Sequence, residues 1–598
     1  MTERLSDKID ALLLPLVRKP SQYLGGEVNQ IIKSPNQVDV TVALAFPDTY
    51  AIGMSHLGFA ILYDALNRLP HVAAERVYCP WIDAADIMRT EKIPLFSWES
   101  RRPLHEFDIV GITLQHELSY SNLLYLLDLA GIAFYAARRQ EDEPLIIGGG
   151  PLADCCEPVA DFFDLVILGD GEEALPAVID AFRQLRKTKC TRRELLLELG
   201  QRFNFVYVPQ FYHCEYNSDG TLVNCVPNET GLPTCIRRTM VDDLDSAVFP
   251  TAPIIPYTDT VHDRIAIEIM RGCPQRCAFC ISGHTKGKVR CRSVENILDI
   301  AWQSYLATGH DTVSLLSLSS SDYPELSRLL QQLYQKFQDK HVGISLPSLR
   351  VDKQLHEVPA QITNVRREGL TVAVETASDR IRRAIGKHVA DSDLIATMEQ
   401  AYRAGWRKVK LYFMIGFPGE TENDILDIVN LTQQISNLRR EVAGSPAEIN
   451  ATVSFLVPKP HTPFAWIPQQ TEDYFQNAKN LILDARRQFR GKSLKFKFHN
   501  LQRSLLEAVF SRGDRRLSCP LETAYRNGAR FDSWDECFSY GLYLDAFKQH
   551  NLDPAFYSQR ERPADESFPW DHLAGDNKKQ LHQRLQQIIK VPGGSENK

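Results

Sequence analysis

Residues 267–293 read IEIMRGCPQRCAFCISGHTKGKVRCRS and hold the densest group of cysteines in the chain. Cys273, Cys277 and Cys280 follow the pattern Cys-x3-Cys-x2-Cys, and Cys291 comes eleven residues after Cys280. The apolar residues before them predict a strand. The other ten of the 13 cysteines are scattered along the chain and are expected to be small buried side chains. Only the dense group predicts a site with its own chemistry.

Three kinds of site use closely spaced thiols. A structural zinc site needs four ligands, so His284 or Cys291 would have to complete the set. A redox pair would use Cys277 and Cys280 and leave Cys273 without a role. An iron–sulfur cluster held by three thiolates accounts for all three and leaves one iron open to a ligand from outside the protein. An open metal position is typical of a reactive site, so the cluster is favoured over zinc.

The composition indicates an ordinary globular protein of several domains. Of the 598 residues, 44% are hydrophobic and 24% are charged, which is neither disordered nor fibrous. No apolar run approaches the roughly 20 residues that span a bilayer. We therefore expect a cytoplasmic protein without a membrane partner. The net charge of −7 argues against a nucleic-acid partner.

Strands and helices alternate in two long stretches of the chain. Residues 1–37 predict a helical extension, and residues 38–200 predict a doubly wound domain with a parallel sheet, because nearly continuous apolar strands are separated by amphipathic helices. Ligands of such sheets bind beyond the carboxyl ends of the strands. Residues 201–258 predict a hairpin and a Pro-rich linker.

The second alternation predicts a partial (β/α)6 barrel over residues 259–492, with its site at the carboxyl ends of the strands. The strands are expected near residues 264–270, 311–318, 342–348, 369–375, 408–415 and 449–457. The cysteine group follows the first of them directly. Residues 493–598 predict a small, mainly helical C-terminal domain. The fold class is thus α/β.

Phe279 stands just before the last cysteine of the group. Cys-x3-Cys-x2-Cys with this aromatic residue, at the end of a first β/α strand, resembles the radical S-adenosylmethionine (SAM) superfamily. The resemblance implies a 4Fe–4S cluster on Cys273, Cys277 and Cys280, whose free iron binds SAM. Reductive cleavage of SAM would then give a 5′-deoxyadenosyl radical that acts on a substrate. It also implies an electron donor such as flavodoxin or ferredoxin.

The same resemblance implies which residues contact SAM. Phe279 beside the cluster, Ser317 after the second strand and Glu375 after the fourth are candidates, and Gly416 and Pro418 after the fifth resemble a segment that packs on the adenine. Further polar groups at strand ends are Ser319, Ser348 and Arg350. Structural roles compete with this interpretation, because a strand-end Glu also serves as a salt-bridge partner and serines also cap helices.

The N-terminal domain is similar to the cobalamin-binding domains that precede many radical SAM barrels. One type of these domains carries Asp-x-His-x-x-Gly, and this chain has Asp48, Tyr50 and Gly53 at the matching positions. Tyr50 replaces the His that would bind cobalt from below. Either cobalamin binds without that imidazole or the domain keeps the fold without the cofactor. His56 and His116 are nearby imidazoles.

Taken over nearly its full length, the chain resembles a bacterial family that joins this domain to a radical SAM barrel, in some genomes beside a small radical-SAM-linked protein. We expect a radical SAM enzyme acting on an unknown substrate, with cobalamin-assisted methyl transfer as one form of the reaction. The first alternative is a methylthiotransferase-like enzyme for RNA or protein, which would use Cys79, Cys155 and Cys156 for a second cluster. The other is a non-catalytic sensor that binds SAM or the cluster.

Overall fold

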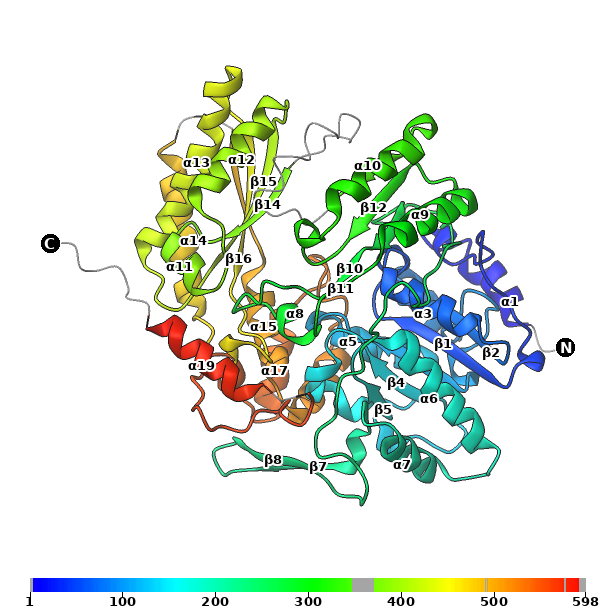
Figure 1. The fold of residues 1–598 in the computed structure, drawn as a ribbon. Coiled ribbons are helices and arrows are strands. Elements are labelled where there is room, and N and C mark those ends of the chain that lie inside the picture. Colours follow the sequence, from blue (N-terminus) through cyan, green and yellow to red (C-terminus); the bar gives the residue numbers. More distant parts are fainter. Residues whose placement is uncertain (1–3, 347–369, 490, 492, 575–576, 591–598) are drawn as a thin grey trace.

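The computed structural model of the chain describes residues 4–346, 370–489, 491, 493–574 and 577–590. Ser348 and Arg350 lie outside the described residues. None of the helices in the described part of the chain has the length and apolar character needed to cross a bilayer. The predicted α/β fold class is confirmed, and Figure 1 shows its arrangement.

The N-terminal domain is built on one six-stranded sheet, in the order β2-β1-β3-β4-β5-β6. Its strands are β1 (Val40–Phe46), β2 (Val72–Tyr78), β3 (Ile109–Thr113), β4 (Leu145–Gly149), β5 (Leu165–Ile167) and β6 (Val206–Tyr207). All are parallel except β6, which runs antiparallel to β5. This order is that of a doubly wound sheet, whose switch point lies between β1 and β3.

Helices connect these strands and cover the sheet (Figure 1). They are α2 (Tyr50–Gly53), α3 (Leu57–Asn67), α4 (Ile82–Thr90), α5 (Tyr120–Ala130), α6 (Gly171–Arg186) and α7 (Arg192–Arg202). At the N-terminus, α1 (Leu5–Lys8) continues into a π-helical turn whose Ile9 and Leu13 are fully buried. The predicted helical extension therefore packs on the domain core.

The hydrophobic pattern of the sequence does not predict strand β2, because two charged residues lie in its middle. All seven of its residues are nevertheless buried. The guanidinium of Arg76 lies 2.7 Å from a carboxylate oxygen of Glu27 and 2.6 Å from one of Glu99. Buried charges persist only when they are paired in this way. The strand is thus held by an ion network between residues far apart in sequence.

The second half of the chain forms two parallel sheets, ordered β13-β12-β9 and β14-β15-β16-β17. The strands are β9 (Ile265–Glu268), β12 (Thr312–Leu316), β13 (Gly343–Ser345), β14 (Leu370–Glu375), β15 (Lys408–Ile415), β16 (Glu448–Phe455) and β17 (Leu494–Phe498). Figure 1 shows the two sheets on opposite sides of the molecule's centre. All six predicted strands are present. β17 is a seventh strand, beyond the predicted boundary at residue 492.

The helices of this half flank the two sheets (Figure 1). They are α9 (Val294–Thr308), α10 (Leu326–Phe337), α11 (Asp379–Ala384), α12 (Asp391–Arg403), α13 (Glu422–Ala443) and α14 (Glu472–Arg487). β17 extends the four-stranded sheet because its residues alternate, with Leu494 buried in the core that this sheet shares with its helices.

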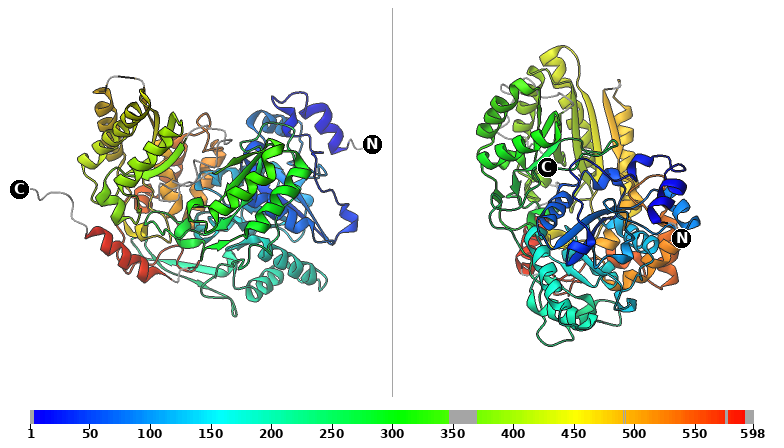
Figure 2. Two further views of the ribbon diagram at one scale, coloured as in Figure 1. Left: turned by 45° about the horizontal axis from the view of Figure 1, so that its top comes forward. Right: turned by 90° about the vertical axis from the view of Figure 1, so that its right-hand side faces the viewer.

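Four C-terminal helices share a core with the N-terminal domain. They are α15 (Leu501–Ser511), α16 (Ser518–Arg526), α17 (Tyr540–Gln549) and α18 (Pro554–Ser558). Leu506, Phe510 and Phe531 belong to the same buried cluster as the six-stranded sheet. Figure 2 shows these four helices, in orange, beside the blue and cyan N-terminal elements. The helix α19 (Lys578–Ile589), in red, packs instead in a cluster with Ala278 and Phe417. The predicted hairpin is β7 (Tyr212–Tyr216) with β8 (Leu222–Pro227).

Candidate active site at the strand ends

The cysteine loop lies near the centre of the molecule, around the short helix α8 (Ser282–Thr285) (Figure 1). It leaves the end of β9, and a two-residue ladder between β10 (Met270–Arg271) and β11 (Arg290–Cys291) closes its base. Cys273, Cys277 and Cys280 are all half-buried. Cys291 lies in the ladder opposite Met270. The fourth cysteine therefore belongs to the base of the loop.

Charged groups surround the central thiol. Burial raises the pKa of Cys277, the ammonium of Lys387 lowers it, and Cys280, Glu375 and Cys273 raise it again, to about 11. Its sulfur lies 3.8 Å from the carbonyl oxygen of Gly386. A bound metal would favour the thiolate, since a coordinating thiol loses its proton. The three cysteines and the Glu375–Lys387 pair thus form one electrostatic site.

The spread of the three sulfurs distinguishes two kinds of metal site. Two groups in the described residues bring at least three ligand atoms within 4.8 Å of one another, Glu157–Cys225–His572 and His116–Glu117–Glu507. The three thiols of the loop are not among them. A tetrahedral zinc ion with bonds of about 2.3 Å holds its sulfurs about 3.8 Å apart. The three loop sulfurs therefore do not have the spacing of the ligands of one bound ion.

His284 binds backbone within the same loop. Its Nε2 lies 3.2 Å from the carbonyl oxygen of Cys277, and burial lowers the pKa of the imidazole. Together with the position of Cys291 in the ladder, this contact gives both proposed fourth zinc ligands a structural role. The zinc interpretation loses its fourth ligand.

Two of the predicted SAM elements lie against each other. The ring of Phe279 packs edge-on against Phe417, with centroids 6.2 Å apart. Phe417 stands between Gly416 and Pro418 in the loop after β15. Gly416 has φ +102°, and its amide donates to a carboxylate oxygen of Glu420 at 2.6 Å. A side chain at Gly416 would collide with Phe475. The loop conformation therefore requires glycine.

Glu375 ends β14 in a left-handed conformation with φ +70°. Its carboxylate lies 3.0 Å from the ammonium of Lys387. It is thus a salt-bridge partner, as the structural interpretation expects, and the same pair lies within electrostatic reach of Cys277. A non-glycine residue with positive φ is a strained position of the kind found at functional sites.

Ser317 follows β12, and its hydroxyl lies 2.9 Å from that of Ser320. The hydroxyl of Ser319 donates to Asp322 at 2.6 Å. The side chain of Gln275, in the cysteine loop, donates to the same carboxylate at 2.8 Å. The segment after β12 is therefore tied to the cysteine loop.

The three residues that match the cobalamin motif have different surroundings. The hydroxyl of Tyr50 donates to Glu27 at 2.7 Å, and the side chain is buried. A Cβ on Gly53 would collide with the ring of Tyr78, so this position is set by packing. Asp48 alone lies at the switch point, where its carboxylate accepts from the indole of Trp534 at 3.1 Å.

The two candidate histidines also differ. His56 begins α3, and its Nδ1 accepts from the amide of Phe59 at 3.2 Å, which is a helix-capping role. His116 follows β3 at the switch point, and 46% of its side chain is exposed. His116 also caps a helical turn, because its Nδ1 accepts from the amide of Leu118 at 3.1 Å.

The carboxyl ends of the two halves meet at a buried ion pair. Lys459, after β16, lies 2.5 Å from Glu117, after β3, and 2.8 Å from Glu507 of α15. Burial alone would raise the pKa of Glu117, but Lys459 and His116 lower it to about 2. Strand ends of the N-terminal sheet and of the four-stranded sheet thus face the same space.

The base of the cysteine loop is anchored on the N-terminal domain. Arg271 pairs with Glu172 at 2.7 Å and with Asp170 at 3.2 Å. Arg290 pairs with Asp170 at 2.7 Å. Asp170 and Glu172 belong to the glycine-containing segment LGDGEE after β5, at a carboxyl end of the parallel sheet, where ligands of such sheets bind. Its carboxylates instead fix the loop.

Four functional positions were missed by sequence reasoning, namely Arg271, Arg290, Lys387 and Lys459. Arg271 and Arg290 flank the cysteine loop at its ladder, so their positions were a usable signal. Lys387 and Lys459 carry no local pattern. Their partners Glu375 and Glu117 lie 12 and 342 residues away.

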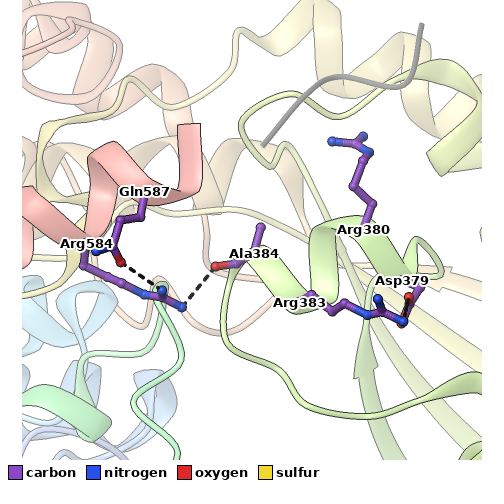
Figure 3. A pocket seen from close by; sticks show the side chains of 6 residues that line it. All are labelled: Asp379, Arg380, Arg383, Ala384, Arg584 and Gln587. Carbon is purple, nitrogen blue, oxygen red and sulfur yellow. Dashed lines mark hydrogen bonds and ion pairs between the residues drawn. The ribbon is translucent and has the colours of Figure 1, made fainter. Parts of the chain in front are cut away.

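Two hollows lie near the cysteine loop. One, of about 270 Å³, is lined by Arg276 and His284 of the loop and by Trp466, Phe568 and Trp570. The other, of about 470 Å³, lies between α11 and α19 (Figure 3). Its lining residues are Asp379, Arg380, Arg383, Ala384, Arg584 and Gln587.

Residues 267–432 match the family described as the radical SAM superfamily, and residues 58–209 match the family described as radical SAM proteins, N-terminal. This chain contains a radical SAM domain. An uncharacterized protein of Methanocaldococcus jannaschii is 24% identical to this radical SAM chain over 479 residues, which are 80% of this chain and 89% of that protein.

Other relatives match over shorter stretches. The ribosomal protein uS12 methylthiotransferase RimO of Desulfotalea psychrophila is 26% identical over 203 residues, 31% of this chain and 45% of that enzyme. The tRNA-2-methylthio-N(6)-dimethylallyladenosine synthase of Sorangium cellulosum is 26% identical over 232 residues, 34% of this chain and 46% of that enzyme. The radical SAM chain thus spans less than half of either methylthiotransferase.

Two solved radical SAM enzymes superpose on this chain with TM-scores below 0.5. The methyltransferase TsrM of Kitasatospora setae, solved with tryptophan and a SAM analogue, superposes with a TM-score of 0.45 and 12% identity, over 71% of this chain and 74% of that chain. The cobalamin-dependent enzyme OxsB, solved with aqua-cobalamin and SAM, superposes with a TM-score of 0.47 and 12% identity, over 92% of this chain and 79% of that chain.

Proposed function

We propose that this chain is an enzyme that holds a 4Fe–4S cluster on Cys273, Cys277 and Cys280 and uses it with SAM to act on a substrate. The supporting observation is the loop itself, with three half-buried thiols at a strand end, spread wider than the ligands of one ion. When bound, the cluster supplies the electron that splits SAM into methionine and a 5′-deoxyadenosyl radical, which removes hydrogen from the substrate.

Residues around the loop then position SAM. Glu375 offers a carboxylate and Lys387 an ammonium beside Cys277, which suits the amino acid end of SAM with its opposite charges. Phe279 and Phe417 offer ring surface for the adenine. Gly416 leaves its backbone open to close approach because it has no side chain. Ser317, with Pro418, completes the set of predicted contacts.

The substrate lies, in this proposal, where the carboxyl ends of the sheets meet. Lys459 and Glu117 close one side of that space with a buried ion pair. The exposed imidazole of His116 faces that space and is available to contact the substrate. If cobalamin assists the reaction by methyl transfer, it occupies the switch point beside Asp48. Tyr50 does not bind cobalt in this proposal, since its hydroxyl is committed to Glu27.

The hollow of Figure 3 is a candidate docking face for the electron donor. Arg584 lies beside Gly386, whose carbonyl contacts the sulfur of Cys277. Arg383 is 76% exposed, and Arg380 lies nearby on the same helix. A cationic face this close to the loop suits an acidic donor such as flavodoxin or ferredoxin.

A methylthiotransferase reaction is the second candidate, because curated relatives carry that activity in their names. The structure gives it little support. Cys79, Cys155 and Cys156 are all buried, and burial raises the pKa of each thiol well above its usual value. All three belong to the hydrophobic core of the N-terminal domain, so a second cluster would require that core to open.

The test is anaerobic reconstitution with iron and sulfide, followed by incubation with SAM, dithionite and cobalamin and product analysis by mass spectrometry. We expect 5′-deoxyadenosine, and S-adenosylhomocysteine with it if the enzyme is a methylase. A reconstituted cluster that yields neither product would support the sensor alternative. A protein that binds one zinc and no iron at the loop would overturn the proposal.

A further inference from the structure

A second group of metal-ligating side chains lies away from the cysteine loop. Cys214 of β7 and Cys225 of β8 are opposite each other in the hairpin. Both are free thiols, with sulfurs 2.7 Å apart. The sulfur of Cys225 lies 3.8 Å from Nε2 of His572. That nitrogen lies 3.3 Å from a carboxylate oxygen of Glu157, and the other oxygen lies 3.9 Å from the sulfur of Cys214. Four donors therefore form a closed ring.

This ring is enclosed by protein. The side chains of His572 and Glu157 are 4% and 2% exposed. Arg515 donates to Glu157 at 3.0 Å, and the hydroxyl of Tyr207 donates to the same carboxylate at 2.5 Å. Two thiolates and a carboxylate around a divalent cation carry one net negative charge, which the guanidinium of Arg515 balances. A buried site needs this kind of compensation.

We propose that Cys214, Cys225, His572 and Glu157 bind one zinc ion. Two sulfurs, one imidazole nitrogen and one carboxylate oxygen are the ligand types that zinc prefers. With bonds of about 2.0 to 2.3 Å, tetrahedral ligands lie about 3.3 to 3.8 Å apart. The distances of 3.8 Å between Cys225 and His572 and of 3.3 Å between His572 and Oε1 of Glu157 match this spacing. Ligand atoms of these three residues all lie within 4.8 Å of one another. Cys214 lies 3.9 Å from the other oxygen, Oε2, so it joins the set as the fourth ligand once its sulfur moves. The two sulfurs need to separate by about 1 Å, which rotation of either side chain provides.

The ion would join segments that are distant in the chain. Glu157 belongs to the N-terminal domain, the two cysteines to the hairpin, and His572 lies 347 residues after Cys225. His572 lies four residues after Phe568 and two after Trp570. These two aromatic residues line the hollow beside Arg276 and His284 of the cysteine loop. The zinc therefore fixes the C-terminal segment that covers the back of the loop.

The measurement is the zinc content of the full-length protein in which Cys273, Cys277 and Cys280 are all replaced by Ala, so that metal on the loop does not contribute. We expect one zinc per chain, and its loss in the further variants Cys225→Ser and His572→Gln. The matched control is Cys235→Ser, a half-buried cysteine of the same region, which keeps its zinc. Cobalt in place of zinc should give the absorption of thiolate-bound metal.

A second measurement compares each folded protein with itself before and after the metal is removed. A strong zinc chelator should lower the melting temperature of the same triple-Ala protein and should leave that of the His572→Gln variant unchanged. If the protein has no zinc and takes up no cobalt after mild reduction, the proposal is wrong. A mass two hydrogens below that of the reduced chain would then assign Cys214 and Cys225 to a disulfide instead.

Discussion

The chain gathers thiols in two places, and the two places are built differently. The loop group has three cysteines within eight residues of sequence, half-buried at a strand end. The ring group draws Cys214, Cys225, His572 and Glu157 from three distant segments, and all of them except the half-buried Cys214 are enclosed. Three protein ligands leave a position for an exchangeable molecule, whereas four protein ligands leave none. The comparison indicates a reactive centre in one place and a structural one in the other.

The largest effects are expected when one cysteine of each group is replaced, because the two variants should lose different properties. Cys277→Ala should abolish formation of 5′-deoxyadenosine, because the cluster loses one of three ligands, while the melting temperature changes little. Cys225→Ala should lower the melting temperature by several degrees, because it opens a site that joins distant segments. Its SAM cleavage at low temperature should persist. Product assays and thermal denaturation of both variants check this, and equal loss of both properties in both variants would break the comparison.

The Glu375–Lys387 pair tests whether the loop group faces a small molecule. Glu375→Gln should weaken SAM binding about tenfold, which corresponds to about 1.4 kcal/mol. Titration calorimetry of the reconstituted protein with SAM measures it. Lys387→Met should weaken SAM binding as well, because its ammonium is the proposed partner of the SAM carboxylate. If Glu375→Gln lowers the melting temperature and leaves the SAM affinity as it was, Glu375 has only its salt-bridge role.

Glu420 makes the loop after β15 sensitive to pH. Burial raises the pKa of its carboxyl from 4.5 to about 7, against the hydrogen bonds from Gly416 and Tyr474 that lower it. The folded state therefore holds the proton more tightly than the unfolded state. Stability should be highest below about pH 4.5 for this group and fall as pH rises to about 7, by up to about 3 kcal/mol. Glu420→Gln should remove this part of the pH dependence, measured by chemical denaturation at pH 5 and pH 8.

The smallest effect is expected at the fourth cysteine near the loop. Cys291→Ala should keep the cluster and the SAM cleavage and cost about 1 kcal/mol of stability, because its side chain lies in the β10–β11 ladder and packs against a core. Iron content and product yield measure this. Loss of iron in the variant would mean that the loop has a fourth protein ligand, and the contrast between the two groups would weaken.

Local patterns made the architecture predictable. Apolar strands alternating with helices indicated the doubly wound domain, and six strands of the second half were placed within a few residues. The cysteine loop was predicted because its ligands are neighbours in sequence. The strand β2 was not predicted, because Glu75 and Arg76 interrupt its apolar run. The strand β17 was not predicted, because its residues were assigned to a mainly helical domain.

Contacts between segments that are distant in sequence could not be predicted. The partners of Arg76, Lys459 and His572 come from other segments, so no local spacing of residues indicates these contacts. Tyr50 shows the opposite case, in which a motif position suggested a cofactor and the folded chain gives the side chain a buried partner, Glu27. Cobalamin binding at Asp48 stays a prediction.

The pairing of Arg271 and Arg290 with Asp170 and Glu172 has an evolutionary consequence. A barrel whose cysteine loop is anchored by another domain is not a portable module, because transplanting it leaves two arginines without their carboxylates. The two parts of the chain must therefore be inherited together. In a lineage that replaces Asp170, selection should also act on Arg290, and these two positions should change in concert across descendants.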